Sequence, residues 1–148
     1  MLKETETAAW TLRMQLQLVG ARGPDELDRA FSTMTRERAE ALIVFPSPML
    51  FNERRRIVDL AAKHRLPSMS DAREFVELGG LIAYGASVND LIRRGANHVD
   101  KILKGAKPAD LRVEQPTKFE LVINLKTAKQ IGVTFPQSIL FQADKVIK

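Results

Sequence analysis

Few side chains in this sequence stand at the spacings that catalysis or metal binding requires. The serines lie at positions 32, 47, 68, 70, 87 and 138, and none occupies the GxSxG turn that exposes a hydrolase nucleophile. His64 and His98 are too far apart for an HExxH motif, so they do not indicate a metal site. No pair of carboxylates stands out as a general acid and base. The sequence gives no reason to expect an enzyme.

Phosphate-binding and thiol chemistry are equally unsupported. Gly79, Gly80 and Gly85 do not form GxGxxG, and GxxxxGK[ST] is missing, so no motif predicts a bound dinucleotide or nucleoside triphosphate. The sequence has no cysteine, which excludes disulfides, thiolate nucleophiles and thiolate metal ligands. We therefore expect no cofactor and no metal.

Polar and ring-bearing residues do follow three apolar runs that suit buried strands. Ser47 lies in the Pro-Ser-Pro turn after the run at 41–45, Asp71 follows the strand expected at 66–69, and Tyr84 ends the one at 81–84. Ligands of open α/β sheets bind beyond the carboxyl ends of the strands. A carboxylate, a hydroxyl and an aromatic ring could hold a small polar or amino-acid-like solute. These three residues are our predicted ligand-binding residues, although Ser47 would also suit a loop, Asp71 a helix N-cap and Tyr84 the edge of the core.

The elements that would position these residues alternate along the chain. Apolar periodicity and capping residues predict helices over 2–14, 24–38, 52–64, 71–77, 89–103 and 125–131, with a terminal helix beginning at Pro136. Among the boundary residues, Asn52, Asp71 and Asn124 are expected to begin their helices, and Gly132 is expected to end the helix at 125–131. Strands are expected at 15–19, 41–45, 66–69, 81–84, 111–113 and 119–123. Such alternation predicts an α/β fold with a mainly parallel sheet flanked by helices.

Composition narrows the class of partner and the compartment. The 148 residues carry a net charge of +5 with 6% aromatic residues, and basic and acidic side chains alternate instead of forming a one-sided basic stripe, so we expect no nucleic-acid partner. No apolar run is long enough to span a bilayer. The N-terminal residues lack the apolar core of a signal peptide, so the chain as written is expected in the cytoplasm.

The C-terminal part of the sequence adds a more specific indication. The segments 99–110 (VDKILKGAKPAD) and 113–129 (VEQPTKFELVINLKTAK), together with 60–67 (LAAKHRLP), 73–80 (REFVELGG) and Tyr84-Gly85, resemble one family. This family is the substrate-binding component of ABC transporters, in the subgroup that includes tryptophan and tyrosine binders. The resemblance covers nearly the whole chain and only the C-terminal half of the family's length.

The resemblance implies a type I periplasmic-binding-protein fold, in which two lobes close over a solute and deliver it to a membrane permease. Residues 1–148 would then form a single C-terminal α/β lobe, in which 81–110 cross toward the first lobe and 111–148 return. The helix at 89–104 would lack its cover, so it is expected to repack, to form a homodimer or to leave the chain unstable. The family acts in the periplasm, which conflicts with the expected cytoplasmic location.

Two other function classes stay open. The same lobe architecture serves as the sensor half of some repressors, so a regulatory or protein-interaction module without a transport role is the alternative, although no helix-turn-helix is visible at the N-terminus. An α/β enzyme would need a nucleophile or metal constellation that the sequence does not offer. The leading interpretation is a truncated solute-binding component of an ABC uptake transporter, specific for an amino acid or a related small solute.

Overall fold

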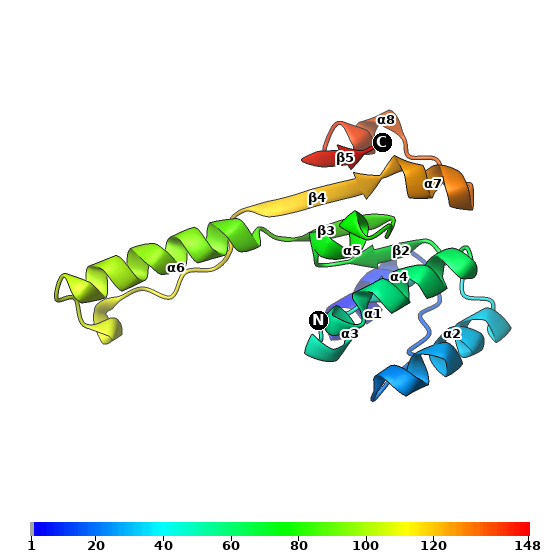
Figure 1. Ribbon diagram of the computed structural model, residues 1–148, viewed down its shortest axis with the longest axis horizontal. Coiled ribbons are helices and arrows are strands. Elements are labelled where there is room, and N and C mark those ends of the chain that lie inside the picture. Colours follow the sequence, from blue (N-terminus) through cyan, green and yellow to red (C-terminus); the bar gives the residue numbers. More distant parts are fainter. Residues whose placement is uncertain (1) are drawn as a thin grey trace.

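A five-stranded mixed sheet forms the centre of the protein, whose computed structural model describes residues 2–148 (Figure 1). Its strands follow one another in chain order, as β1 (Leu42–Val44), β2 (Ser68–Ser70), β3 (Ile82–Ala86), β4 (Phe119–Asn124) and β5 (Lys145–Ile147). Neighbouring strands are parallel except for β3 and β4, which are antiparallel. The expected α/β fold with a mainly parallel sheet is therefore confirmed.

The helices differ widely in how much of their surface they bury. They are α1 (Leu2–Thr11), α2 (Leu27–Arg36), α3 (Pro48–Asn52), α4 (Arg54–Lys63), α5 (Arg73–Glu77), α6 (Val88–Leu103), α7 (Leu125–Ile131) and α8 (Gln137–Leu140), with 3₁₀ turns η1 (Pro24–Glu26) and η2 (Pro108–Asp110). Apolar side chains of α2, α4 and α5 meet those of β1 in the main core. Val76 of α5 forms a second cluster with Ala83 and Val122.

The two faces of the sheet are covered unequally. Strand register places Val44, Ser70, Ala83 and Val122 in one row across four strands, and all four are buried beneath α2, α4 and α5. The row on the opposite face runs from Ile43 through Met69 and Ile82 to Ile123. Ile123 is fully buried, whereas Ile43 is 50% exposed at the edge strand. On this second face, burial of the sheet therefore decreases from β4 to the edge strand β1.

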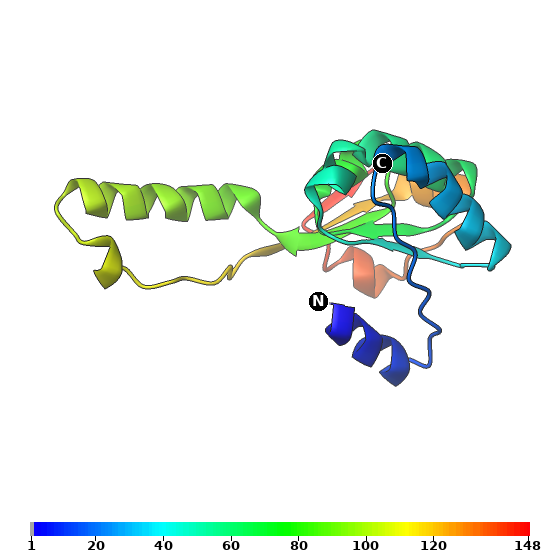
Figure 2. The ribbon, with the colours of Figure 1, turned by 90° about the horizontal axis from the view of Figure 1, so that it is seen from below.

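A long arm leaves the sheet between β3 and β4 (Figures 1 and 2). It consists of residues 88–118, namely α6, η2 and the extended segment that returns to β4. The Ser87 N–H donates to the Lys118 carbonyl (2.9 Å), which ties the two ends of the arm together. Among the described residues, none of 88–118 is buried. The body from which the arm projects, residues 24–86 and 119–147, is called the lobe below.

The N-terminal helix α1 is similarly unpacked. Figure 2 shows α1 on one side of the sheet and α2 on the other, joined by residues 12–23. Within the described chain, α1 has no buried residue, and Trp10 is 83% exposed. The helix ends at Thr11, earlier than the expected residue 14.

Three expected elements differ from the structure, and one strand was not expected. Residues 15–19 are extended but belong to no strand of the described sheet, because no other strand lies alongside to share hydrogen bonds. Residues 111–113 are irregular for the same reason, since they return along the exposed arm. The terminal helix from Pro136 stops at Leu140 and gives way to the unexpected strand β5, which pairs with β4.

The predicted capping residues are partly wrong and partly confirmed. Asn52 ends α3 instead of capping α4, and Ala72, not Asp71, stands at the N-cap of α5. Asn124 does cap α7, where its side-chain oxygen accepts from the Thr127 N–H (3.0 Å). Gly132 closes the same helix in a left-handed conformation (φ 78°), as glycine at this position typically does.

Candidate functional site

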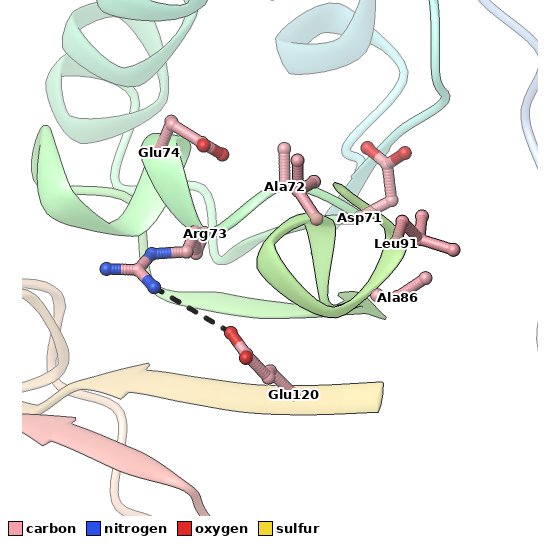
Figure 3. A pocket seen from close by; sticks show the side chains of 9 residues that line it. Asp71, Ala72, Arg73, Glu74, Ala86, Leu91 and Glu120 are labelled. Atoms are coloured by element: carbon pink, nitrogen blue, oxygen red, sulfur yellow. Dashed lines mark ion pairs between the residues drawn. The ribbon is translucent and has the colours of Figure 1, made fainter. Parts of the chain in front are cut away.

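A cavity of about 230 Å³ lies where the lobe meets the base of the arm (Figure 3). It is found at the carboxyl ends of β2 and β3, which is the edge where open α/β sheets bind ligands. Because β4 runs antiparallel to β3, its first residues reach the same edge. The lining residues are Asp71, Ala72, Arg73, Glu74, Gly85, Ala86, Val88, Leu91 and Glu120.

Gly85 allows the floor of this cavity to form. A Cβ atom at this position would lie 1.8 Å from the carbonyl oxygen of Asp71, a distance that no side chain could accept. The missing side chain thus lets β3 pass directly against the loop after β2. This close approach of two backbones explains why glycine follows Tyr84 here.

A network of charged and polar groups spans the cavity from α5 to β4. Arg73 contacts Glu120 (3.8 Å), as Figure 3 shows, and donates more closely to Glu77 (2.8 Å). The buried Ser87 hydroxyl donates to Glu120 Oε1 (2.6 Å). Ser87 also precedes α6, so Glu120 joins the start of the arm to the lobe. The hydrogen bond from Arg73 is the main cause that lowers the pKa of Glu77, and the same pairing raises the pKa of Arg73.

Of the three predicted binding residues, the structure places one in the cavity wall. Asp71 lines the cavity, its side chain is exposed, and within residues 2–148 it has no ion-pair partner. Tyr84 pairs with Leu121 on β4 and stacks on Phe119 (5.7 Å between ring centroids), outside the cavity lining. Ser47 precedes α3, where its carbonyl accepts from the Phe51 N–H, and it also lies outside the lining. A binding role for these residues stays a prediction.

Sequence reasoning missed Arg73, Glu74 and Glu120 as cavity residues. It also missed Ser87, which hydrogen-bonds to Glu120. The usable signal was Glu120, a carboxylate near the start of an otherwise apolar strand. Its meaning depended on the antiparallel pairing of β3 with β4, which the alternation of helices and strands did not reveal. Once that pairing is known, Glu120 must lie at the same edge as Asp71 and Gly85.

The side chains around this cavity are of types that can bind a small polar ligand. Its charged groups are three carboxylates, from Asp71, Glu74 and Glu120, and the guanidinium of Arg73, with a floor of small residues. The described residues contain no cluster of His, Cys, Asp and Glu suited to a metal ion. None of the helices within 2–148 combines the length and hydrophobicity needed to cross a bilayer.

Comparison with known proteins agrees with this geometry. A conserved domain protein from Vibrio cholerae O1 biovar El Tor N16961 superposes with a TM-score of 0.88 at 21% identity, over 98% of this chain and 49% of its own. An ABC domain from Streptococcus pneumoniae in complex with L-Trp gives 0.87 at 27% identity, over 99% of this chain and 50% of its own. A ligand-free, open substrate-binding protein with adhesive properties from Clostridium difficile gives 0.70 at 17% identity, over 99% and 48%.

The chain thus spans about half the length of these solved structures. No curated protein sequence is matched. The family described as ABC transporter substrate binding protein matches residues 2–147, nearly the whole sequence. The fold, the cavity at the carboxyl edge of the sheet and this match lead to one conclusion: the chain belongs to the ABC transporter substrate-binding protein family.

Proposed function

We propose that this chain is the second lobe of a two-lobe solute-binding protein, and that the cavity at the base of the arm is its share of the solute site. The observation that carries the proposal is the position of the cavity, between the carboxyl edge of the sheet and the first turn of α6. A solute there would contact both the lobe and the arm. In the family, such a solute is handed to a membrane permease of an ABC transporter, outside the cytoplasm.

The arm supports a division of the chain between two lobes. We propose that residues 81–110 pass toward a first lobe and that 111–148 return from it. The Ser87–Lys118 hydrogen bond (2.9 Å) supports this proposal, because it holds the outgoing and returning connections side by side at the base of the arm. Exposed apolar side chains on α6, including Ile92, Val99 and Leu103, would find their cover on that lobe. Each large side chain left in water forgoes roughly 1.5–3 kcal/mol of burial free energy.

The charges around the cavity favour a solute with an amino group. Arg73 is already paired with Glu77 and Glu120, whereas Asp71 is exposed and without an ion-pair partner in the described chain. We propose that the Asp71 carboxylate receives the ammonium group of an amino acid or a related solute. Tyr84 and Ser47 lie outside the cavity lining, so they would contact only a part of the solute that extends beyond the cavity. The complex of the Streptococcus pneumoniae domain with L-Trp, at 27% identity, supports an amino-acid-like solute.

One lobe supplies one wall, so binding by this chain alone is expected to be weak, with a Kd on the order of millimolar. The test is an NMR titration of ¹⁵N-labelled chain with L-tryptophan. Amide signals of Asp71, Gly85 and Glu120 should shift together. Asp71→Asn should reduce the shifts several-fold, and Asp59→Asn, an exposed position on α4, should leave them unchanged. Shifts scattered over the lobe, or equal in both variants, would contradict the proposed site.

A homodimer through α6 is a separate proposal for the chain when no other lobe is present. The exposed apolar residues of α6 are available to a second copy. Light scattering at increasing protein concentration should then show a rising mass, and Leu103→Lys should keep the chain monomeric. A mass independent of concentration would exclude this dimer.

A further inference from the structure

An open apolar groove of about 400 Å³ lies on the lobe where β4 and β5 end. Because β4 runs from the arm toward α7, its end is on the far side of the lobe from α6 (Figure 1). The residues that line the groove are Leu125, Gln137, Leu140, Phe141, Val146 and Lys148. Phe141 directly follows α8 and is 85% exposed, so an aromatic ring projects into solvent beside the groove.

The segment that builds this groove is strongly basic. Residues 125–148 contain Lys126, Lys129, Lys145 and Lys148 but only one acidic residue, Asp144. The Asp144 carboxylate accepts a backbone N–H of β4 (2.8 Å), and Lys145 lies 3.3 Å from a glutamate of α5. Each of the other three lysines is exposed, and in the described part of the chain none of them has an ion-pair partner.

These three unpaired lysines lie on the groove or next to it. Lys148 lines the groove, and Lys129 stands one turn after Leu125, so the side chains of these two α7 residues share one face. Lys126 is exposed on the same helix. The terminal carboxylate of the chain offsets one of the three charges, which leaves an excess of positive charge. This surface is called the C-terminal face below and consists of Leu125, Lys126, Lys129, Leu140, Phe141, Val146 and Lys148.

Projecting apolar side chains among unpaired lysines are typical of a surface that binds a bilayer with anionic lipids. Aromatic and aliphatic side chains enter the boundary between headgroups and acyl chains, and lysines are attracted to the lipid phosphates. A groove that receives a peptide would instead enclose side chains of the partner, whereas Phe141 stands largely in solvent. The combination of charge and exposure therefore favours a lipid surface over an acidic peptide.

We propose that the C-terminal face docks on the surface of a membrane that contains anionic phospholipids. Phe141 and Leu140 enter the headgroup region, and the three unpaired lysines lie beside the phosphates. The proposed handover of a solute to a permease already requires the protein to work at a membrane. The inference rests on that proposal only for the nearby bilayer, and it does not depend on any solute.

The test is co-sedimentation of the 148-residue chain with vesicles of phosphatidylcholine that contain about 30% phosphatidylglycerol. We expect the chain to sediment with these vesicles and to stay in solution with pure phosphatidylcholine. Binding should weaken at least about tenfold when the NaCl concentration is raised from about 0.05 M to about 0.5 M, because salt screens the attraction.

Two pairs of lysine substitutions compare the C-terminal face with the arm. Lys126→Gln combined with Lys129→Gln should weaken vesicle binding at least about tenfold. Lys101→Gln combined with Lys107→Gln removes the same charge from exposed positions of the arm and should leave binding nearly unchanged. The comparison separates docking by the C-terminal face from attraction by net charge alone.

The aromatic residue is tested separately. Phe141→Ser should weaken vesicle binding several-fold, whereas Val113→Ser, at a 98% exposed position of the arm, should not. Phe141→Trp combined with Trp10→Phe leaves a single tryptophan in the chain, on the C-terminal face. Its fluorescence emission should move to shorter wavelength when phosphatidylglycerol vesicles are added.

The proposal is overturned if the chain does not sediment with the anionic vesicles, if both lysine pairs weaken binding equally, or if the tryptophan emission does not move. Binding of a glutamate-rich apolar peptide without binding of vesicles would assign the face to a protein partner and would also overturn it. Solute titration reports on Asp71 and Gly85 instead, so either proposal can fail without the other.

Discussion

Helices α4 and α6 have similar amphipathic sequences and opposite surroundings. In α4, Ile57, Val58, Leu60 and Ala61 are buried in the core of the lobe. In α6, the apolar residues recur at comparable spacing, but none is buried among the residues the structure describes. Burial against a partner supplies most of the stability of a helix in a protein. The comparison teaches that amphipathic periodicity alone does not bury a helix; under the two-lobe proposal, α6 carries one side of an interface whose other side is not in this chain.

The largest expected difference in stability is between two isoleucine-to-alanine substitutions, one in each of these helices. Ile57→Ala leaves a cavity in the core and should lower the free energy of unfolding by about 2–5 kcal/mol. Ile92→Ala removes an exposed side chain from the arm and should change it by less than about 0.5 kcal/mol. Urea unfolding followed by circular dichroism measures both. Equal losses would show that α6 is packed after all.

The next largest difference in stability is expected between two glycine-to-alanine substitutions, one in β3 and one in α6. Gly85→Ala forces a Cβ against the Asp71 carbonyl and should cost about 1–3 kcal/mol while distorting the cavity. Gly95→Ala, in α6, meets open space and should only raise the helix content of the arm. Thermal unfolding of the two variants checks this, and a well-tolerated Gly85→Ala would refute the close approach of β3 to the loop after β2.

A smaller loss of stability is expected in the lobe when the pH is lowered. The Arg73 hydrogen bond, assisted by Lys145, lowers the pKa of Glu77 below its usual value of 4.5. A carboxylate whose pKa is lower in the folded state stabilises the fold above the unfolded value, and this contribution is lost as the pH falls through the lowered pKa. Stability should therefore decline as the pH falls through 4.5 and below. Glu77→Gln should flatten that decline; an unchanged pH profile in the variant would argue against the pairing.

The smallest effect is expected in the arm, where a contact made by His98 weakens as the pH rises instead of as it falls. Hydrogen bonds to the carbonyls of Arg94 and Arg112 raise the pKa of His98 above 6.5 and link α6 to the returning segment. This link is complete below pH 6.5 and is lost as the pH rises through the raised pKa. NMR signals of residues 111–113 should broaden as the pH increases. The same broadening in His98→Gln would rule out this histidine as its cause.

Local sequence signals explain much of the fold. Asn124 and Gly132 bound α7 as expected, and the apolar runs before Ser47 and Asp71 became β1 and β2. Signals of this kind are carried by neighbouring residues and need no distant partner. The cavity was predictable as an edge of the sheet, and Asp71 lies in its wall.

What could not be predicted depends on pairing between distant segments. Glu120 joins the cavity only because β4 runs antiparallel to β3, and β5 exists only because it pairs with β4. Residues 15–19 have the pattern of a strand but no strand beside them. Sequence periodicity states which face an element can bury, and a partner decides whether it does so.

Amide hydrogen exchange of the chain at low protein concentration tests the central claim most directly. If α6 is half of an interface, its amides should exchange nearly as fast as those of an isolated helix, while the amides of α4 exchange only through opening of the lobe. Protection in α6 equal to that in α4 would mean that the arm packs within these 148 residues. The proposal that α6 packs against a first lobe outside these residues would then be wrong.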